Sequence, residues 1–161
     1  MSTGPLLIIW HSRTGTSEQI ARAANRGSGE GGRLMRAADV SPEDLLAAGG
    51  YLFCCPENLA FMSGEMKEMF DRCYYPVLGR IEGRPYATVI AAGSDGEGAQ
   101  RQIDRIATGW RLKRVTEPWI EMMDAQEPEE ILAPKTVDEA SLDRAVELGA
   151  ALTEGIAQGI F

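Results

Sequence analysis

The sequence lacks the residue patterns that mark several common functions. It has one histidine and three cysteines in 161 residues, and Cys54, Cys55 and Cys73 do not have the spacing of a metal-binding set. No apolar run approaches the length of a membrane span. Acidic residues outnumber basic ones 24 to 16, and the net charge is −8, which argues against binding to nucleic acid or to an anionic membrane surface. We therefore expect no metal site, no nucleic-acid partner and no membrane attachment.

The cysteines and the beginning of the chain also predict the compartment. An odd number of cysteines leaves one thiol over in any disulfide scheme, and the adjacent Cys54 and Cys55 in an apolar run are typical of small buried hydrophobic residues. The first apolar run begins by Leu6, which leaves no room for a signal peptide. Reduced thiols without a targeting segment predict a cytoplasmic protein.

The length and composition suit one globular domain. A chain of 161 residues with 44% hydrophobic content can bury a sizeable core. No internal repeat or linker interrupts it, so we expect residues 1–161 to form a single domain.

A hydroxyl-rich loop between an apolar run and a helical pattern organises the chain. The apolar run covers residues 6–10, and the helical pattern begins at Glu18. Free backbone N–H groups at a helix start favour an anion, and a glycine in the loop lets the backbone approach a ligand closely. The loop lacks both the Gly-Lys-Ser/Thr ending and the GxGxxG pattern of nucleotide-binding loops, so a single phosphomonoester is the favoured ligand. The residues of this phosphate loop are Ser12, Arg13, Thr14, Gly15, Thr16 and Ser17.

An ordinary strand-to-helix turn is the alternative interpretation of the same loop. Thr16 and Gln19 have the spacing of a capping box, which would stabilise the helix start whether or not a ligand binds. Four hydroxyls in six positions exceed what a cap needs, which favours the phosphate interpretation.

Apolar runs and helical stripes alternate along the rest of the chain. We expect strands within residues 6–10, 33–37, 51–55, 84–92 and 112–123, the last interrupted by Pro118 and therefore at a sheet edge. We expect helices at residues 16–25, from Ser41-Pro42 to about residue 49, and at 99–110. Another helix is expected from residue 63, where an apolar stripe is formed by Met66, Met69, Phe70, Cys73 and Val77. The last helix is expected from Thr136, which forms a second capping-box pattern with Glu139. Loops are expected at residues 26–32, 56–62, 93–98 and 125–135.

Five alternations of strand and helix predict an α/β fold, a doubly wound five-stranded parallel sheet with helices on both faces. Strand order 2-1-3-4-5 would place the first and third strands side by side, so that their carboxyl ends diverge at a topological switch point, where ligands bind. The loops at residues 12–17, 56–63 and 93–98 all follow strands. We therefore expect these three loops to meet at one edge of the sheet and to form a binding site there.

These three loops resemble, in order, those of the flavodoxin-like flavoprotein superfamily, which includes flavodoxins and NAD(P)H-dependent quinone and FMN reductases. Residues 12–17 are similar to its Ser/Thr-x-Thr-Gly-x-Thr/Ser phosphate motif, and residues 56–67 to the second flavin loop of the reductases. The resemblance implies a flavodoxin-like fold and noncovalently bound FMN. It assigns the phosphate to Ser12, Thr14, Gly15, Thr16 and Ser17 with added charge from Arg13, one side of the ring to Pro56, Glu57, Asn58, Leu59 and Phe61, and the other side to Gly93, Ser94 and Gly98.

The same resemblance implies a redox function. The first alternative is an NAD(P)H-dependent oxidoreductase that reduces a quinone, a flavin or a similar small acceptor, with NAD(P)H as co-substrate and no catalytic acid or base from the protein. The second is a flavodoxin-type electron carrier that passes electrons to a redox protein. Flavodoxin-type carriers usually hold the flavin between aromatic rings. Phe61 is the one aromatic residue of the second loop and the third loop has none, which counts against a carrier. The net charge of −8 favours a carrier, because an acidic carrier is steered toward basic partners. A module that has lost its flavin is the third alternative, and the four hydroxyls argue against it. Dimers and tetramers are common among the reductase relatives, so the resemblance also leaves a homodimer as an open alternative.

Two further residues at the predicted site have plainer interpretations. His11 could act as an acid beside the flavin, but a hydrogen-bonded structural role is favoured at a strand end. Cys55 precedes the second loop, and we expect it to be a buried, inert thiol.

Overall fold

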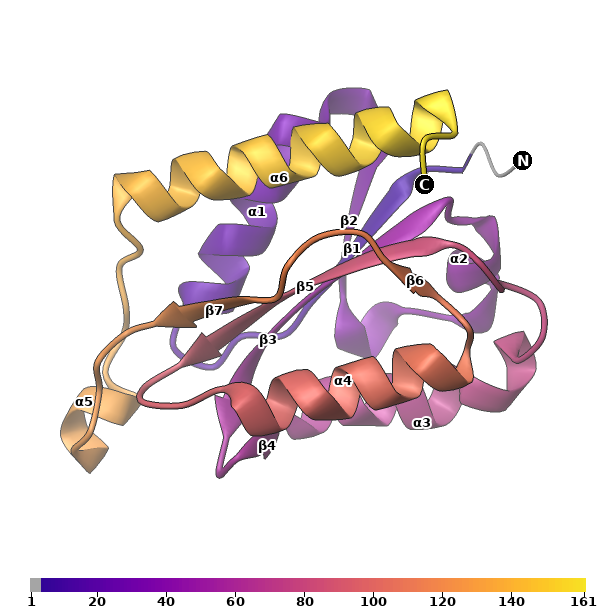
Figure 1. Ribbon diagram of the computed structural model, residues 1–161. Coiled ribbons are helices and arrows are strands. Elements are labelled where there is room, and N and C mark those ends of the chain that lie inside the picture. Colours follow the sequence, from indigo (N-terminus) through magenta and orange to yellow (C-terminus); the bar gives the residue numbers. More distant parts are fainter. Residues whose placement is uncertain (1–3) are drawn as a thin grey trace.

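A computed structural model describes residues 4–161, in which strands and helices alternate along the chain (Figure 1). The strands are β1 (Leu6–Trp10), β2 (Gly32–Arg36), β3 (Gly50–Asn58), β4 (Phe61–Met62), β5 (Pro85–Ala92), β6 (Lys113–Arg114) and β7 (Trp119–Met122). The helices are α1 (Thr16–Ser28), α2 (Pro42–Ala47), α3 (Gly64–Val77), α4 (Glu97–Gly109), α5 (Pro128–Leu132) and α6 (Glu139–Gln158). The predicted α/β class is confirmed.

The sheet has the strand order β2-β1-β3-β5-β6 with parallel pairing, and β7 also pairs with β5 in parallel. β6 and β7 together occupy the place of the expected fifth strand. Pro118 lies between them and has no N–H to donate to the ladder, so the edge strand breaks there. The predicted order 2-1-3-4-5 is confirmed, with its last strand in two pieces and with β4 added as a short antiparallel partner of β3.

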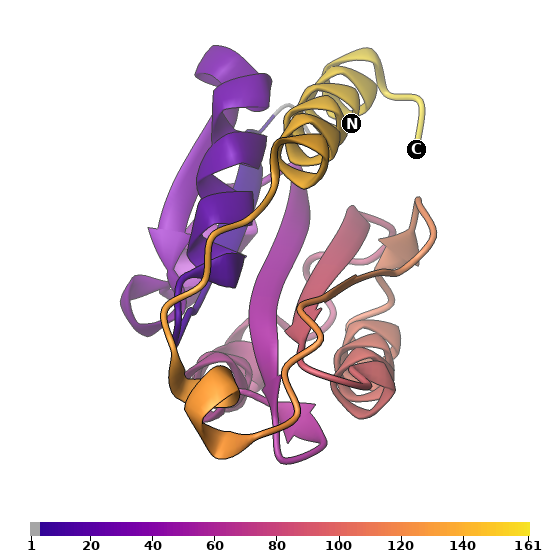
Figure 2. The same ribbon diagram turned by 90° about the vertical axis from the view of Figure 1, so that its left-hand side faces the viewer.

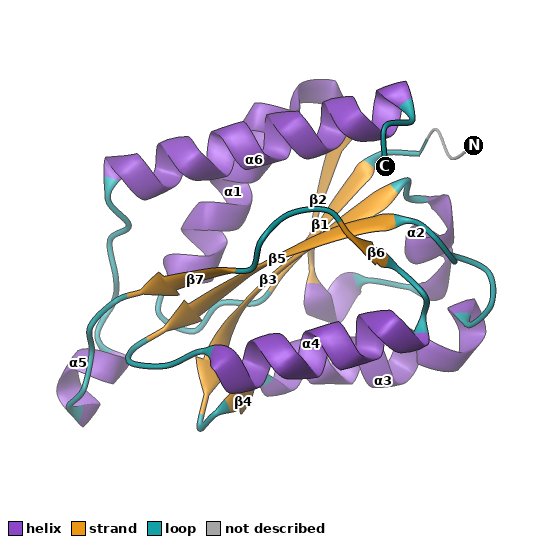
Figure 3. Ribbon diagram, viewed as in Figure 1, coloured by secondary structure: helices purple, strands orange, loops and turns teal. Residues whose placement is uncertain are grey.

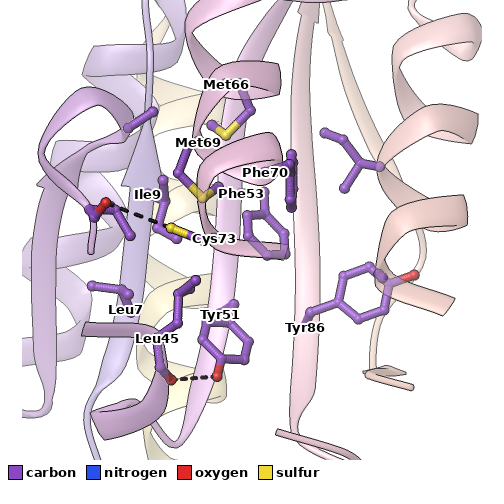
Figure 4. Packing of buried hydrophobic residues seen from close by; sticks show 14 of the residues in the cluster. Leu7, Ile9, Leu45, Tyr51, Phe53, Met66, Met69, Phe70, Cys73 and Tyr86 are labelled. Atoms are coloured by element: carbon purple, nitrogen blue, oxygen red, sulfur yellow. Dashed lines mark hydrogen bonds between the residues drawn. The ribbon is translucent and has the colours of Figure 1, made fainter. Parts of the chain in front are cut away.

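Helices cover both faces of the sheet (Figure 3). The five side chains of β1 are buried and alternate between the two cores: Leu6, Ile8 and Trp10 pack with α1 and α6, whereas Leu7 and Ile9 pack with α2, α3 and α4. Figure 4 shows the second of these cores, in which Met66, Met69, Phe70 and Cys73 of α3 lie over the sheet. This two-sided burial explains why the central strands are continuous apolar runs.

The thiols of Cys54, Cys55 and Cys73 are buried, and none forms a disulfide within residues 4–161. No helix in this part of the chain combines the length and the apolar character needed to cross a membrane.

The first helix is longer than its sequence pattern predicts. α1 continues to Ser28, so the loop expected at residues 26–32 is wrong over its first half. α1 crosses α6, and this contact stabilises the last turn of α1. Ser28 Oγ donates to Ala24 O within α1 (2.9 Å) and to Gly149 O of α6 (3.2 Å). Tertiary packing thus carries the helix through a segment that its glycine content predicts to be a loop.

Of the expected helix caps, one is confirmed and two are wrong. Ser41 and Asp44 form the capping box of α2. At α1 the N-cap is Gly15, and Gln19 donates to Gly15 O and Lys135 O instead of closing a box with Thr16. The N-cap of α6 is Asp138, whose Oδ1 accepts from Ser141 N (2.8 Å), so the expected Thr136 and Glu139 box does not form.

The segment expected to be a loop at residues 125–135 contains a short helix. α5 begins at Pro128, which is favoured in the first turn of a helix, and Lys135 Nζ donates to Glu130 O (2.6 Å) and Ala133 O (2.6 Å) at its end. A cation at the carboxyl end of a helix is favourable. The expectation of a loop is therefore wrong for residues 128–132.

Candidate functional site

The carboxyl ends of the central strands surround a pocket with a volume of about 410 Å³. Figure 2 views the molecule from this side, with α5 near the start of α1 and the β4 hairpin. The volume lies within the range of small-molecule and cofactor sites, about 300–1,000 Å³. The structure brings together, as lining residues, the sequence-predicted Arg13, Thr14, Thr16, Pro56, Glu57, Asn58, Leu59, Gly93 and Ser94. The predicted Ser12, Gly15 and Ser17 belong to the same loop but are not among the residues that line the pocket.

The phosphate loop has the geometry of an anion cradle. Gly15 is the N-cap of α1 with φ of 110°, a conformation that glycine adopts without strain. Ser12 Oγ accepts from Gly15 N (3.0 Å) and fixes the turn. Ser17 Oγ is buried and has no hydrogen-bond partner among residues 4–161. A buried hydroxyl without a partner at a helix N-terminus fits a phosphate oxygen as the missing partner, so the residues present fit the phosphate of FMN.

The second loop is a tight hairpin rather than an open loop. β3 continues to Asn58, which pairs with Phe61 of β4. The two residues between them, Leu59 and Ala60, both have positive φ (53° and 68°). A type I′ hairpin turn requires positive φ at both positions, which residues with side chains rarely adopt. Glu57 Oε2 accepts from Gly96 N (2.6 Å) and so joins this hairpin to the third loop.

The third loop places its glycines at close approaches of the backbone. A Cβ on Gly93 would lie 2.5 Å from Ala125 O, and a Cβ on Gly98 would lie 2.1 Å from Ala60 O. Gly98 therefore lets α4 pack against the hairpin turn and is not among the residues that line the pocket. Phe61 is also outside the lining, with 59% of its surface exposed on β4.

A fourth segment of the wall was missed by the sequence interpretation. It follows β7, the last strand to end at this edge, so the rule that loops at carboxyl strand ends form the site could have found it. Its acidic, proline-containing composition indicated only a loop. The additional lining residues are Ala60 and Asp95 of the expected loops, Ala91 and Ala92 at the end of β5, and Met123, Ala125, Ile131, Leu132 and Lys135 of this segment.

His11 lies beneath the second loop as a hydrogen-bonded residue. Its Nδ1 is 2.9 Å from Ser63 Oγ, the N-cap residue of α3, and its Nε2 is 3.8 Å from Glu65 Oε2. Burial lowers the pKa of His11 below its ordinary value of 6.5, with Arg36 and Arg13 acting in the same direction and Glu65 opposing them.

This lowered pKa predicts a pH dependence of stability. The unfolded chain binds a proton to His11 more readily than the folded protein, so we expect the free energy of unfolding to fall as the pH drops from about 7 to about 5.5. His11→Gln keeps a hydrogen-bonding side chain and does not titrate, so its stability should stay flat over this window. Urea unfolding midpoints measured across the window test this. A wild-type profile that is flat, or that rises toward acid, would contradict the expected direction.

Cys55, the residue before the second loop, is an inert thiol. It is fully buried, and burial raises its pKa to about 12, although hydrogen bonding with Ser63 opposes this rise. Because the thiolate is the reactive form, this side chain is not a nucleophile at neutral pH.

A larger cavity of about 550 Å³ lies at the opposite edge of the sheet, beside the amino-terminal end of β5. Arg84 lines this cavity and could in principle bind an anion, but its guanidinium group donates to Leu46 O (2.7 Å) and Ala48 O (2.7 Å) at the end of α2. The guanidinium group therefore stabilises the fold, and the carboxyl-end pocket is the candidate site.

Comparison with known proteins agrees with this geometry. The profile of the family described as NADPH-dependent FMN reductase matches residues 37–126, a range that contains the second and third loops. A flavodoxin of Aquifex aeolicus (strain VF5) is 29% identical over 99 residues, which cover 59% of this chain and 54% of that protein. The chain thus matches about half the length of this curated relative.

Solved structures show the same fold. A flavodoxin from the domain Archaea superposes with a TM-score of 0.75 at 16% identity, covering 94% of this chain and 98% of the other. A flavodiiron protein from Giardia intestinalis gives a TM-score of 0.78 at 16% identity, covering 98% of this chain and 37% of the other. A WrbA-like protein from Agrobacterium tumefaciens gives 0.69 at 14% identity, covering 96% and 98%. Together with the family match, they confirm the resemblance to flavodoxin-like flavoproteins.

Proposed function

Because the chain belongs to the NADPH-dependent FMN reductase family, we propose that it is an FMN-dependent oxidoreductase that passes a hydride from NADH or NADPH to a quinone, a flavin or a similar small acceptor. One observation carries this proposal. The phosphate loop, which contains the Ser17 hydroxyl that has no partner among the described residues, contributes Arg13, Thr14 and Thr16 to the lining of a pocket of about 410 Å³, and this lining contains no aromatic ring. A wall without aromatic rings would leave one face of a bound flavin accessible to a substrate.

The two ends of the pocket would bind different parts of FMN, the phosphate at one end and the ring at the other. At the phosphate end, the hydroxyls of Thr14 and Thr16 and the charge of Arg13 would hold the dianionic group. At the other end, the backbone of residues 56–59 and 93–94 would lie along the ring. FMN when bound supplies two-electron redox chemistry, whereas the protein supplies position and electrostatics.

The charges near the ring also bear on the acceptor. Glu57 and Asp95 line the pocket on the loops assigned to the ring, whereas Arg13 and Lys135 belong to the phosphate loop and the segment beside it. Two carboxylates close to the ring would repel an anionic acceptor. We therefore propose an uncharged acceptor.

A direct assay tests the enzyme proposal. Purified protein is mixed with FMN, NADH or NADPH, and benzoquinone, and nicotinamide oxidation is followed by absorbance. We expect turnover of about 1 s⁻¹ or more, the ordinary range for enzymes. FMN without protein and protein without FMN are the controls. Oxidation no faster than with free FMN would contradict the proposal.

An electron carrier is the second candidate, favoured by the similarity to the Aquifex aeolicus flavodoxin and by the net charge of −8. Such a carrier would exchange electrons with a basic redox protein rather than with a nicotinamide. Anaerobic addition of NADPH to the FMN-loaded protein separates the two functions, because the enzyme loses its flavin absorbance directly and a carrier does so only when a separate reductase is added.

We also propose that the protein works in the cytoplasm. The three buried, free thiols support a reducing compartment, where disulfides are rare. Fractionation of the source cells would test this location.

A further inference from the structure

A segment with no assigned role forms one wall of the pocket. Residues 123–137, here called the strap, run from the end of β7 to the start of α6 and include α5. The strap supplies several pocket-lining residues, among them Met123, Ile131, Leu132 and Lys135. In Figure 2 it runs down from α6 to α5 and back to the sheet.

The strap is fastened at both ends to the loops that form the site. At its beginning, Met123 N donates to Ala92 O (2.8 Å) and Ala125 N donates to Gly93 O (3.1 Å), which attaches it to the third loop. At its end, Lys135 N donates to Thr14 O (2.8 Å), which attaches it to the phosphate loop. The strap therefore bridges the two loops assigned to opposite ends of the flavin.

One side chain holds the junction between the strap and the phosphate loop. Gln19, in the first turns of α1, donates through Nε2 to Gly15 O (2.9 Å) and to Lys135 O (2.9 Å). Its Oε1 accepts from Val137 N (3.0 Å). Both halves of this amide thus bind backbone groups, one in the phosphate loop and two in the strap. A cap needs none of the strap contacts, so helix formation does not explain them.

We propose that Gln19 is a positioning residue for the cofactor phosphate, acting by tying the phosphate loop to the strap. The inference rests on the proposed binding of FMN. Gly15 has a left-handed conformation, and its carbonyl accepts from both the backbone N–H and the side-chain amide of Gln19, so these bonds fix the backbone of the phosphate loop at the start of α1. Preorganised donors bind an anion without the cost of ordering the loop at the moment of binding.

Thermodynamic linkage predicts that phosphate binding also changes the stability of the strap. If Gln19 couples strap order to the geometry of the phosphate loop, phosphate binding must stabilise the strap by as much as strap order favours phosphate binding. Riboflavin, which has the same ring and no phosphate, should lack this coupling.

The experiment compares Gln19→Met, which keeps the length of the side chain and removes its hydrogen bonds, with the wild type and with Gln158→Met. Gln158 is a matched control because its Nε2 donates to Glu154 Oε1 (2.8 Å), and both side chains are exposed at the end of α6. Neither residue lines the pocket. Flavin fluorescence gives the dissociation constants for FMN and riboflavin, and mass spectrometry gives amide exchange in the strap. We expect Gln19→Met to lower the preference for FMN over riboflavin by about tenfold, the effect of losing roughly one charge-linked hydrogen bond.

Amide hydrogen exchange in the strap is the second measurement. FMN should slow amide exchange at residues 123–137 in the wild type and in Gln158→Met, and should do so less in Gln19→Met. Equal weakening of FMN and riboflavin, or unchanged affinity for both, would overturn the inference while leaving FMN binding by the wild type intact. A wild type that binds no FMN would instead remove the proposed function, and the inference with it. Should Gln19→Met not fold, Gln19→Ala, which adds no charge and removes the same three hydrogen bonds, is expected to show the same loss of preference.

Discussion

Replacement of Ser17 by alanine is expected to weaken FMN binding by about 1.5–3 kcal/mol, or ten- to a hundredfold, while leaving the free protein at least as stable as the wild type. The two effects have one cause. The Ser17 hydroxyl is buried without a hydrogen-bond partner among the described residues. Its removal therefore breaks no internal hydrogen bond and removes the desolvation cost of a buried, unpaired hydroxyl. Alanine is also the better helix former. A bound phosphate would be the partner, and the variant would lose that charge-assisted bond.

Ser28→Ala is the matched control, since it removes a buried serine hydroxyl from the same helix. Ser28 Oγ donates to Ala24 O (2.9 Å) and Gly149 O (3.2 Å), so this change should lower stability and leave FMN affinity unchanged. Fluorescence titration gives the affinities, and thermal unfolding of the free proteins gives the stabilities. Unchanged FMN affinity in Ser17→Ala would mean that the phosphate binds elsewhere.

Replacement of Gly149 by alanine is expected to destabilise the protein by about 3 kcal/mol, at the upper end of ordinary overpacking. A Cβ at this position would lie 1.9 Å from Ala24 O in α1, and a Cβ on Gly27 would lie 2.0 Å from Val146 O in α6. The two helices therefore cross backbone against backbone. Because α1 begins at the phosphate loop, separation of the helices would also disturb the site.

The sign of this effect distinguishes packing from helix propensity. Alanine is favoured over glycine within a helix by about 1 kcal/mol, so propensity alone predicts a gain at Gly149. Gly64 in the first turn of α3 is the control, because a Cβ there meets no atom of the described chain within 4 Å, and Gly64→Ala should be neutral or slightly stabilising. Thermal unfolding should show a fall in Tm of about 6–12 °C for Gly149→Ala. A stabilised Gly149→Ala would contradict the backbone contact.

The sheet and the region of the site could be predicted from the sequence because their determinants are local or topological. Burial on both faces makes a central strand a continuous apolar run, which is visible in the residues of β1, β3 and β5. The right-handed connections of parallel strands leave few strand orders, and these connections bring the loops after β1, β3 and β5 to one edge. The phosphate loop was recognisable because its hydroxyls and glycine are adjacent in the chain.

Contacts between distant segments decided what the sequence could not. The capping box expected from Thr16 and Gln19 does not form, because the Gln19 amide binds Lys135 and Val137, more than a hundred residues away. The same kind of contact extended α1 to Ser28. A local spacing rule cannot anticipate such partners, since they compete for the same donors and acceptors only once the chain has folded.

The sequence by itself determined an acidic α/β protein with a hydroxyl-rich, glycine-containing loop at the start of its first helix, because hydrophobic periodicity and loop chemistry are properties of neighbouring residues. Only the tertiary structure decided that the Ser17 hydroxyl lacks a partner, that Gly98 serves packing, and that the strap forms the fourth wall of the pocket. Each of these depends on which backbone atoms of remote segments come within a few ångströms of each other, and this distance is set by the packing of the helices on the sheet.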